Sequence, residues 1–99
     1  MDTERLRAFV ALAEHGHFAR AAHRLNITQP GLTKRIHALE AELGGALFDR
    51  QRQPAGVTPL GRLLLPQARR ILSDIDALVD DARRAAAGEI GSLAIGFGL

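Results

Sequence analysis

Apolar residues recur at helical spacing three times within the first 43 positions of the chain. Steps of one, three and four residues place each set on one face of an α-helix. The pattern predicts three short amphipathic helices around a shared core. The sets are Leu6, Phe9, Val10 and Ala13, then Phe18, Ala21, Ala22 and Leu25, then Leu32, Ile36, Leu39 and Leu43.

Capping and breaking residues mark the ends of these helices. Thr3 is the expected N-cap of the first helix, and Gly16 is its stop. Thr28 is the expected N-cap of the third helix, which ends at the glycines 44–45. Pro30 is tolerated near its start because the N–H groups of a first turn lack partners anyway.

A very short connection joins the second and third predicted helices. Asn26 tolerates the left-handed backbone that ends a helix, and Ile27 is available to fill the core. Two helices so close in sequence predict a helix-turn-helix, in which the second helix lies in the major groove of DNA.

A hairpin follows. Leu47 and Phe48 predict a short strand, residues 54–56 a turn, and Val57 the start of a return strand. The expected architecture is therefore mostly α: a winged helix-turn-helix of three helices plus a two-stranded β-hairpin wing, followed by a long dimerisation linker helix.

The linker helix starts at Thr58-Pro59, and Gly88 ends it after Ala87. Its expected length is about 45 Å at 1.5 Å per residue, with a bend near Pro66. Apolar positions spaced alternately by four and three predict a coiled-coil seam that pairs two copies of the chain. The seam residues are Leu64, Ala68, Ile71, Ile75, Leu78, Ala82 and Ala85.

The alternating apolar residues at 92–98 are typical of a β-strand, but the sequence contains no sheet that this strand could join. The chain is therefore expected to stop as a second domain begins. The expected divisions are 1–58 for the winged helix-turn-helix DNA-binding domain, 59–88 for the linker and dimerisation helix, and 89–99 for the start of a truncated further domain.

Charge is divided unevenly along the 99 residues, although the net charge is only +2. Up to Leu72 there are eleven basic and six acidic side chains, and beyond it two basic and five acidic. A basic front suggests a polyanionic partner at that end, although scattered solvated charge is an equally good reading of this feature alone. With no cysteine, secretory signal or membrane-length apolar run, we expect a soluble cytoplasmic protein.

The exposed face of the third helix carries the candidate base-reading groups. Glutamine can bond adenine through two atoms, threonine and proline can pack on a thymine methyl, and lysine can reach guanine or phosphate. Thr28, at the N-terminus of the helix, suits a phosphate. The candidate DNA-binding residues are Thr28, Gln29, Pro30, Thr33, Lys34 and His37, together with Arg50 and Arg52 of the wing.

The two wing arginines are expected in a narrow A·T-rich minor groove, which attracts inserted arginine. Arg50 is the stronger of the two candidates; the alternative for it is a surface ion pair with Asp49 or Glu42. Further possible phosphate contacts are Arg5, Arg20, Arg24 and Arg35.

Neither a metal site nor an enzyme is expected. The four histidines share no helical face at the i, i+4 spacing of metal ligands, and no acid, base and nucleophile come together. No cofactor is implied. The histidines are His15, His17, His23 and His37.

Spaced motifs along most of the chain resemble the N-terminal region of LysR-type transcriptional regulators. They are LRAFV at 6–10, GHFARAA at 16–22, LNITQPGLTKRI at 25–36, LEAELG at 39–44, LFDR at 47–50, TPLG at 58–61 and ARRIL at 68–72. The resemblance implies double-stranded operator DNA as an interrupted palindrome, a homodimer through the linker helix and a tetramer of the full-length protein. A small-molecule effector would bind the C-terminal domain of periplasmic-binding-protein type, which residues 89–99 would begin.

Three positions depart from the family pattern. His17 replaces the usual serine, which weakens the N-cap of the second helix. Gly31 replaces alanine, which costs roughly 1 kcal/mol of helix propensity but permits a closer backbone approach. The wing tip at 51–56 is less basic than is usual in the family.

Three alternatives stay open at this point. A winged-helix regulator of the molybdate-responsive type would share the reader, although the linker length and the ARRIL block favour the LysR type. A non-specific architectural protein would bind scrambled DNA as tightly as an operator. In a pure coiled-coil interaction module, the excess of basic side chains up to Leu72 would have no binding function.

Overall fold

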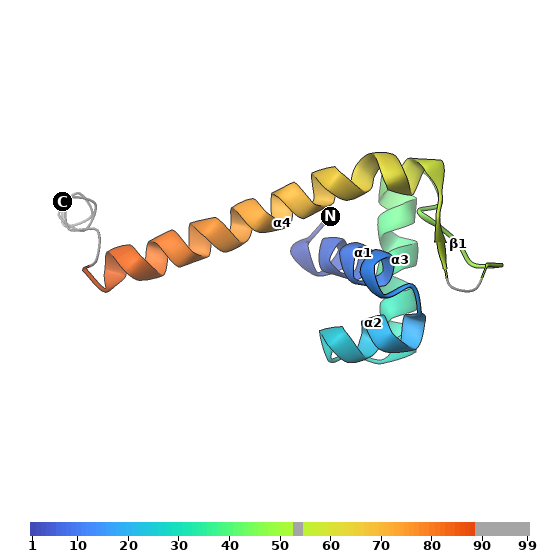
Figure 1. Ribbon diagram of the computed structural model, residues 1–99, viewed down its shortest axis with the longest axis horizontal. Coiled ribbons are helices and arrows are strands. Elements are labelled where there is room, and N and C mark those ends of the chain that lie inside the picture. Colours follow the sequence, from blue (N-terminus) through green and yellow to red (C-terminus); the bar gives the residue numbers. More distant parts are fainter. Residues whose placement is uncertain (53–54, 89–99) are drawn as a thin grey trace.

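A computed structural model describes residues 1–52 and 55–88 of the chain. Three helices and a hairpin form a compact domain, from which a fourth helix extends (Figure 1). This confirms the mostly α winged helix-turn-helix with a long C-terminal helix. The elements are α1 (Thr3–His15), α2 (Phe18–Leu25), α3 (Gln29–Leu43), β1 (Phe48–Asp49), β2 (Gly56–Val57) and α4 (Pro59–Ala86).

One core joins all of these elements. The rings of Phe9 on α1 and Phe48 on β1 meet edge to face, with centroids 5.7 Å apart, so the wing packs on the first helix. Ala68 and Leu72 bring the first half of α4 onto the same core. The largest fully buried side chains are Phe9, Leu12, Leu32, Ile36, Leu39 and Leu47.

The helix ends differ from expectation at one cap. Asp2, not Thr3, is the N-cap of α1, and its Oδ1 accepts a hydrogen bond of 2.8 Å from the Arg5 N–H. Thr3 is already helical, because aspartate is the better cap of the two neighbours. His17 makes no side-chain capping bond, as its residue type predicts.

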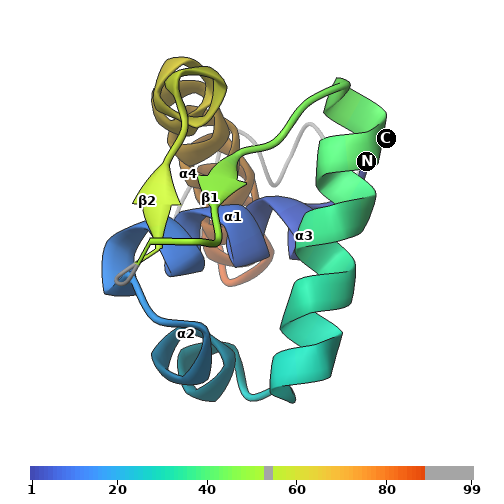
Figure 2. The ribbon, with the colours of Figure 1, turned by 90° about the vertical axis from the view of Figure 1, so that its right-hand side faces the viewer.

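The hairpin is antiparallel, with Phe48 opposite Val57 and Asp49 opposite Gly56. The first strand begins one residue later than expected, at Phe48, and the second one residue earlier, at Gly56. Leu47 still accepts a hydrogen bond across the hairpin from the Thr58 N–H at 3.0 Å, but its own N–H donates to the Glu40 carboxylate. Figure 2 shows the two strands beside the first turns of α4, with α3 along the other side of the domain.

The long helix α4 runs through Pro66 without interruption. Gly88, the expected stop, has a left-handed φ of 81°. Residue Pro54 of the expected turn and the strand expected at 92–98 lie outside the described residues. Across the described ranges, no helix is long and apolar enough to cross a membrane.

A tight joint connects α4 to the wing. The Thr58 hydroxyl donates to the Ala46 carbonyl at 2.6 Å and accepts from the Gly61 N–H at 3.0 Å, which caps the helix. A Cβ at Gly61 would lie 2.4 Å from the Leu47 carbonyl oxygen and 2.6 Å from Val57 Cγ1. Glycine is therefore required for α4 to approach the hairpin this closely.

We expect Gly61→Ala to lower the free energy of unfolding by roughly 1–3 kcal/mol through overpacking, although alanine usually favours a helix. Denaturant unfolding followed by circular dichroism measures the loss. Ser73→Ala, at an exposed position of the same helix, is the control and should change stability little. An unchanged Gly61→Ala midpoint would show that the joint can relax.

Candidate nucleic-acid interface

The turn between α2 and α3 sets the direction of the third helix. Asn26 adopts the left-handed conformation, with φ 62°, and the Ile27 N–H donates to the Ala22 carbonyl at 3.0 Å. The Ile27 side chain packs against the core. The turn is thus anchored on both its backbone and its side chain, which gives α3 a fixed start.

Thr28 caps α3, as its type and position predict. Its Oγ1 accepts a hydrogen bond of 3.1 Å from the Gly31 N–H. A Cβ at Gly31 would lie 3.1 Å from the same oxygen, a tight contact. The glycine therefore leaves room for the capping hydroxyl, a reason for glycine that the sequence alone does not provide.

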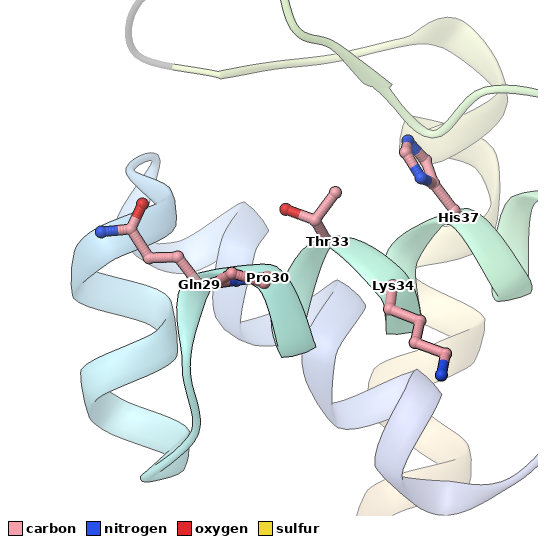
Figure 3. A pocket seen from close by; sticks show the side chains of 5 residues that line it. All are labelled: Gln29, Pro30, Thr33, Lys34 and His37. Atoms are coloured by element: carbon pink, nitrogen blue, oxygen red, sulfur yellow. The ribbon is translucent and has the colours of Figure 1, made fainter.

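The exposed face of α3 is fixed by the burial of its opposite face. Leu32, Ile36 and Leu39 are fully buried, so the helix cannot rotate without exposing them. Five side chains line one shallow hollow on the outer face (Figure 3): Gln29, Pro30, Thr33, Lys34 and His37. The structure thus brings together the five residues of this helix whose side chains were expected to read bases.

The hollow offers a mixed set of polar and apolar groups. Gln29 presents an amide with both donor and acceptor atoms at one end, and Pro30 lies beside it (Figure 3). Thr33 and His37 line one side of the hollow, and the Lys34 side chain extends from its opposite side (Figure 3). Such a face can bond base edges and, through the ammonium group, a phosphate.

Two arginines beside the start of α1, Arg5 and Arg35, are paired with acids. Arg35 lies 3.6 Å from Glu4, and Arg5 bonds the Glu42 carboxylate, which also receives the Met1 ammonium group. The Met1 ammonium and Arg5 lower the pKa of Glu42. Arg5 and Arg35 are therefore weaker phosphate candidates than the exposed Arg20 and Arg24 of α2, for which the described residues show no ion pair.

Arg50 of the wing has an ion pair, but not with the acids expected. Its Nη2 donates to Glu40 Oε1 at 3.1 Å, so the partner is neither Asp49 nor Glu42. The segment after α3 folds back so that Arg50 lies beside the last turns of that helix, at Glu40 and not at Glu42. Arg52 is exposed.

The four histidines lie at separate places in the fold. Among the described residues, no group of three histidine, cysteine, aspartate or glutamate side chains could hold a metal ion. His37 lies in the α3 hollow, whereas His15 ends α1 and His17 caps α2 without a side-chain bond.

A helix-turn-helix with a hairpin wing defines the class of winged helix-turn-helix DNA-binding domains. Residues 3–62 match the family model described as bacterial regulatory helix-turn-helix protein, lysR family. The chain belongs to this family, which sets aside the molybdate-responsive alternative. The family model and the relatives found describe transcriptional regulators, in agreement with the expectation that the chain is not an enzyme.

Known relatives resemble the chain over nearly its whole length. It is 47% identical over 97 residues to the HTH-type transcriptional regulators TfdS of Cupriavidus pinatubonensis and IlvR of Caulobacter vibrioides. Each alignment covers 98% of this chain and 33% of the relative, so the chain spans about a third of the length of these curated relatives.

Solved structures give the same picture. The BenM_DBD/catB site 1 DNA complex has a TM-score of 0.85 and 39% identity, over 90% of this chain and 96% of that one. The LysR family transcriptional regulator CbnR has a TM-score of 0.82 and 41% identity, over 89% of this chain and 30% of that one.

We expect Thr28→Ala to lower the free energy of unfolding by about 1 kcal/mol, because the Gly31 N–H loses its acceptor. Thermal unfolding of the two chains measures the difference. Thr3→Ala is the matched control: Asp2 caps α1, so this substitution should change stability by less than about 0.5 kcal/mol. Equal losses in both variants would mean that the Thr28 hydroxyl does not stabilise its helix end.

Proposed function

We propose that the chain binds an interrupted palindromic operator as a homodimer, with α3 in the major groove and the wing in the minor groove. One observation carries the proposal: the side chains of Gln29, Pro30, Thr33, Lys34 and His37 share one outward hollow of α3. Relatives described as DNA complexes support the same partner, double-stranded DNA. Chromosomal DNA as the partner implies that the protein works in the cytoplasm.

Each residue on α3 has a role that its chemistry favours. Gln29 reads adenine through its amide, and Pro30 and Thr33 pack on thymine methyl groups. Lys34 reaches a guanine edge or a phosphate, and Thr28 lies where the free N–H groups of the helix start receive a phosphate. His37 lies further along the same face of α3 and extends the surface that would contact the DNA.

An apolar stripe on α4 supports the homodimer. Ile71, Leu78 and Val79 are 45%, 69% and 41% exposed in the single chain, although all three are large and apolar. Together with Ile75 and Ala82, they form a continuous stripe at helical spacing, which a second copy of α4 would cover. Val79 belongs to this stripe, although the strict alternation of four and three leaves it out.

Three of the seam residues are already covered in the single chain, Leu64 and Ala68 at the start of the seam and Ala85, which is 6% exposed, at its end. Ala68 is only 4% exposed and belongs to the core of its own chain, and Leu64 packs against that core. The proposed dimer interface therefore extends from Ile71 to Ala82. Its twofold symmetry would present two α3 helices to two half-sites, which fits a palindrome.

Two alternatives predict different binding. An architectural protein would show no preference among duplexes, and a coiled-coil module would show no salt-dependent DNA binding at all. Selection of bound duplexes from a random pool tests the proposal against both, because a symmetric motif with fixed spacing is expected only of an operator-binding dimer. The effector and the tetramer of the full-length protein stay predictions.

We expect Gln29→Ala to weaken binding to the selected operator by about 1–3 kcal/mol and to leave scrambled DNA nearly unaffected, since one bidentate base contact is lost. Competition binding at fixed salt measures both affinities. Thr28→Ala, which removes a positioning contact, should weaken both duplexes alike. If Gln29→Ala also reduces both affinities by one factor, its side chain does not read a base.

We expect Leu78→Asp to dissociate the dimer, because a charge would have to be buried in the stripe. The wild-type chain should sediment as a dimer at tens of micromolar and the variant as a monomer. Ala77→Asp, which adds the same charge at an exposed position beside the stripe, should stay dimeric. A monomeric wild-type chain would contradict the homodimer.

A further inference from the structure

Glu40 joins the end of the third helix to the start of the wing. Its backbone carbonyl accepts from the N–H groups of Gly44 and Gly45, at 2.8 and 3.1 Å. Its carboxylate accepts from the Leu47 N–H at 2.7 Å and from Arg50 Nη2 at 3.1 Å. The Glu40 side chain is only 11% exposed, so these contacts are poorly screened by water.

Arg50 is held on two sides. Besides its bond to Glu40, its guanidinium carbon lies 6.0 Å from the centre of the Phe18 ring, at the start of α2. The other arm of the hairpin is fixed as well, because the Ala55 N–H donates to the Gly16 carbonyl at 2.7 Å. The base of the wing is thus attached to α3 and to the turn between α1 and α2.

Arg52 is in a different situation. Its side chain is exposed, and no carboxylate of the described residues lies within ion-pair distance of it. Its Cδ would lie 3.3 Å from a Cβ at Gly56, so the side chain crosses the hairpin where glycine leaves space. Its charge is therefore available for a ligand.

We propose that Glu40 is a positioning residue that fixes the wing through Arg50, and that Arg52, not Arg50, makes the minor-groove contact. This rests on the proposed function, namely on the wing entering the minor groove. Moving Arg50 into the groove would break its bond to Glu40 and leave that poorly exposed carboxylate without its cation, close to the phosphates. Arg52 reaches DNA without this cost.

The proposal makes the two arginines separable by experiment. The wild-type chain is compared with Arg52→Ala, Arg50→Met and Glu40→Gln on selected operators with A·T-rich and G·C-rich flanks, over a range of salt. Arg52→Ala should abolish the preference for A·T-rich flanks and reduce the salt slope by about one, with an unchanged melting temperature. Arg50→Met should keep the salt slope but lower the melting temperature.

Glu40→Gln decides how Arg50 acts. Glutamine can still accept the Leu47 N–H but loses the charge that holds Arg50. The control is Glu42→Gln, which removes an equal charge from the same helix, where the partner is Arg5. Against this control, Glu40→Gln should bind A·T-flanked operators roughly three- to tenfold more weakly, because the wing loses its position.

Two results would overturn the proposal while leaving the proposed function intact. In one, Glu40→Gln binds more tightly than Glu42→Gln, as expected if Arg50 is released to contact DNA. In the other, Arg52→Ala keeps both the flank preference and the salt slope of the wild type. A wild-type chain that binds operators without any flank preference would instead contradict the minor-groove contact of the proposed function, and the Arg52 assignment with it.

Discussion

The burial of one side of α3 is the constraint on which the rest of the molecule depends. Leu32, Ile36 and Leu39 have no exposed surface, so any rotation of the helix would move large apolar groups into water. That fixed rotation places the five residues that line the α3 hollow on the outer face of the domain. It also fixes Glu40, one position beyond the last of the three, on the flank where the wing begins.

The same constraint extends into α4 through short connections. The wing lies in the segment from Ala46 to Gly61. The two ends of this segment are joined, because the Thr58 hydroxyl donates to the Ala46 carbonyl and Gly61 packs against the Leu47 carbonyl. Further along, Arg7 of α1 bonds Asp76 of α4 at 3.1 Å. The direction of α4 is therefore set by its contacts with α1 and the wing, so that pairing of two α4 helices would also determine the separation of two α3 helices.

The sequence predicted the helices and the α3 face because helical periodicity is a local property that neighbouring residues share. It did not predict contacts that depend on the path of the chain: the sequence offered Glu42 or Asp49 as partners of Arg50, and which acid of α3 faces the wing is decided by how the chain turns after the helix. An apolar stripe also does not reveal what covers it: Ala68 is buried in its own chain, whereas Leu78 is exposed. Asp2 and Thr3 were both competent caps, and only geometry distinguishes them.

The change of charge along the sequence coincides with a change in what α4 contacts. Up to Leu72, which is buried on the core, the chain is predominantly basic; beyond it α4 is mostly acidic and extends away from the domain (Figure 1). Acidic side chains on the projecting half would be repelled by phosphates, whereas the basic domain would be attracted. A bound duplex would therefore be directed to α3 and the wing and kept off the projecting half of α4, whose apolar stripe stays available for a second copy.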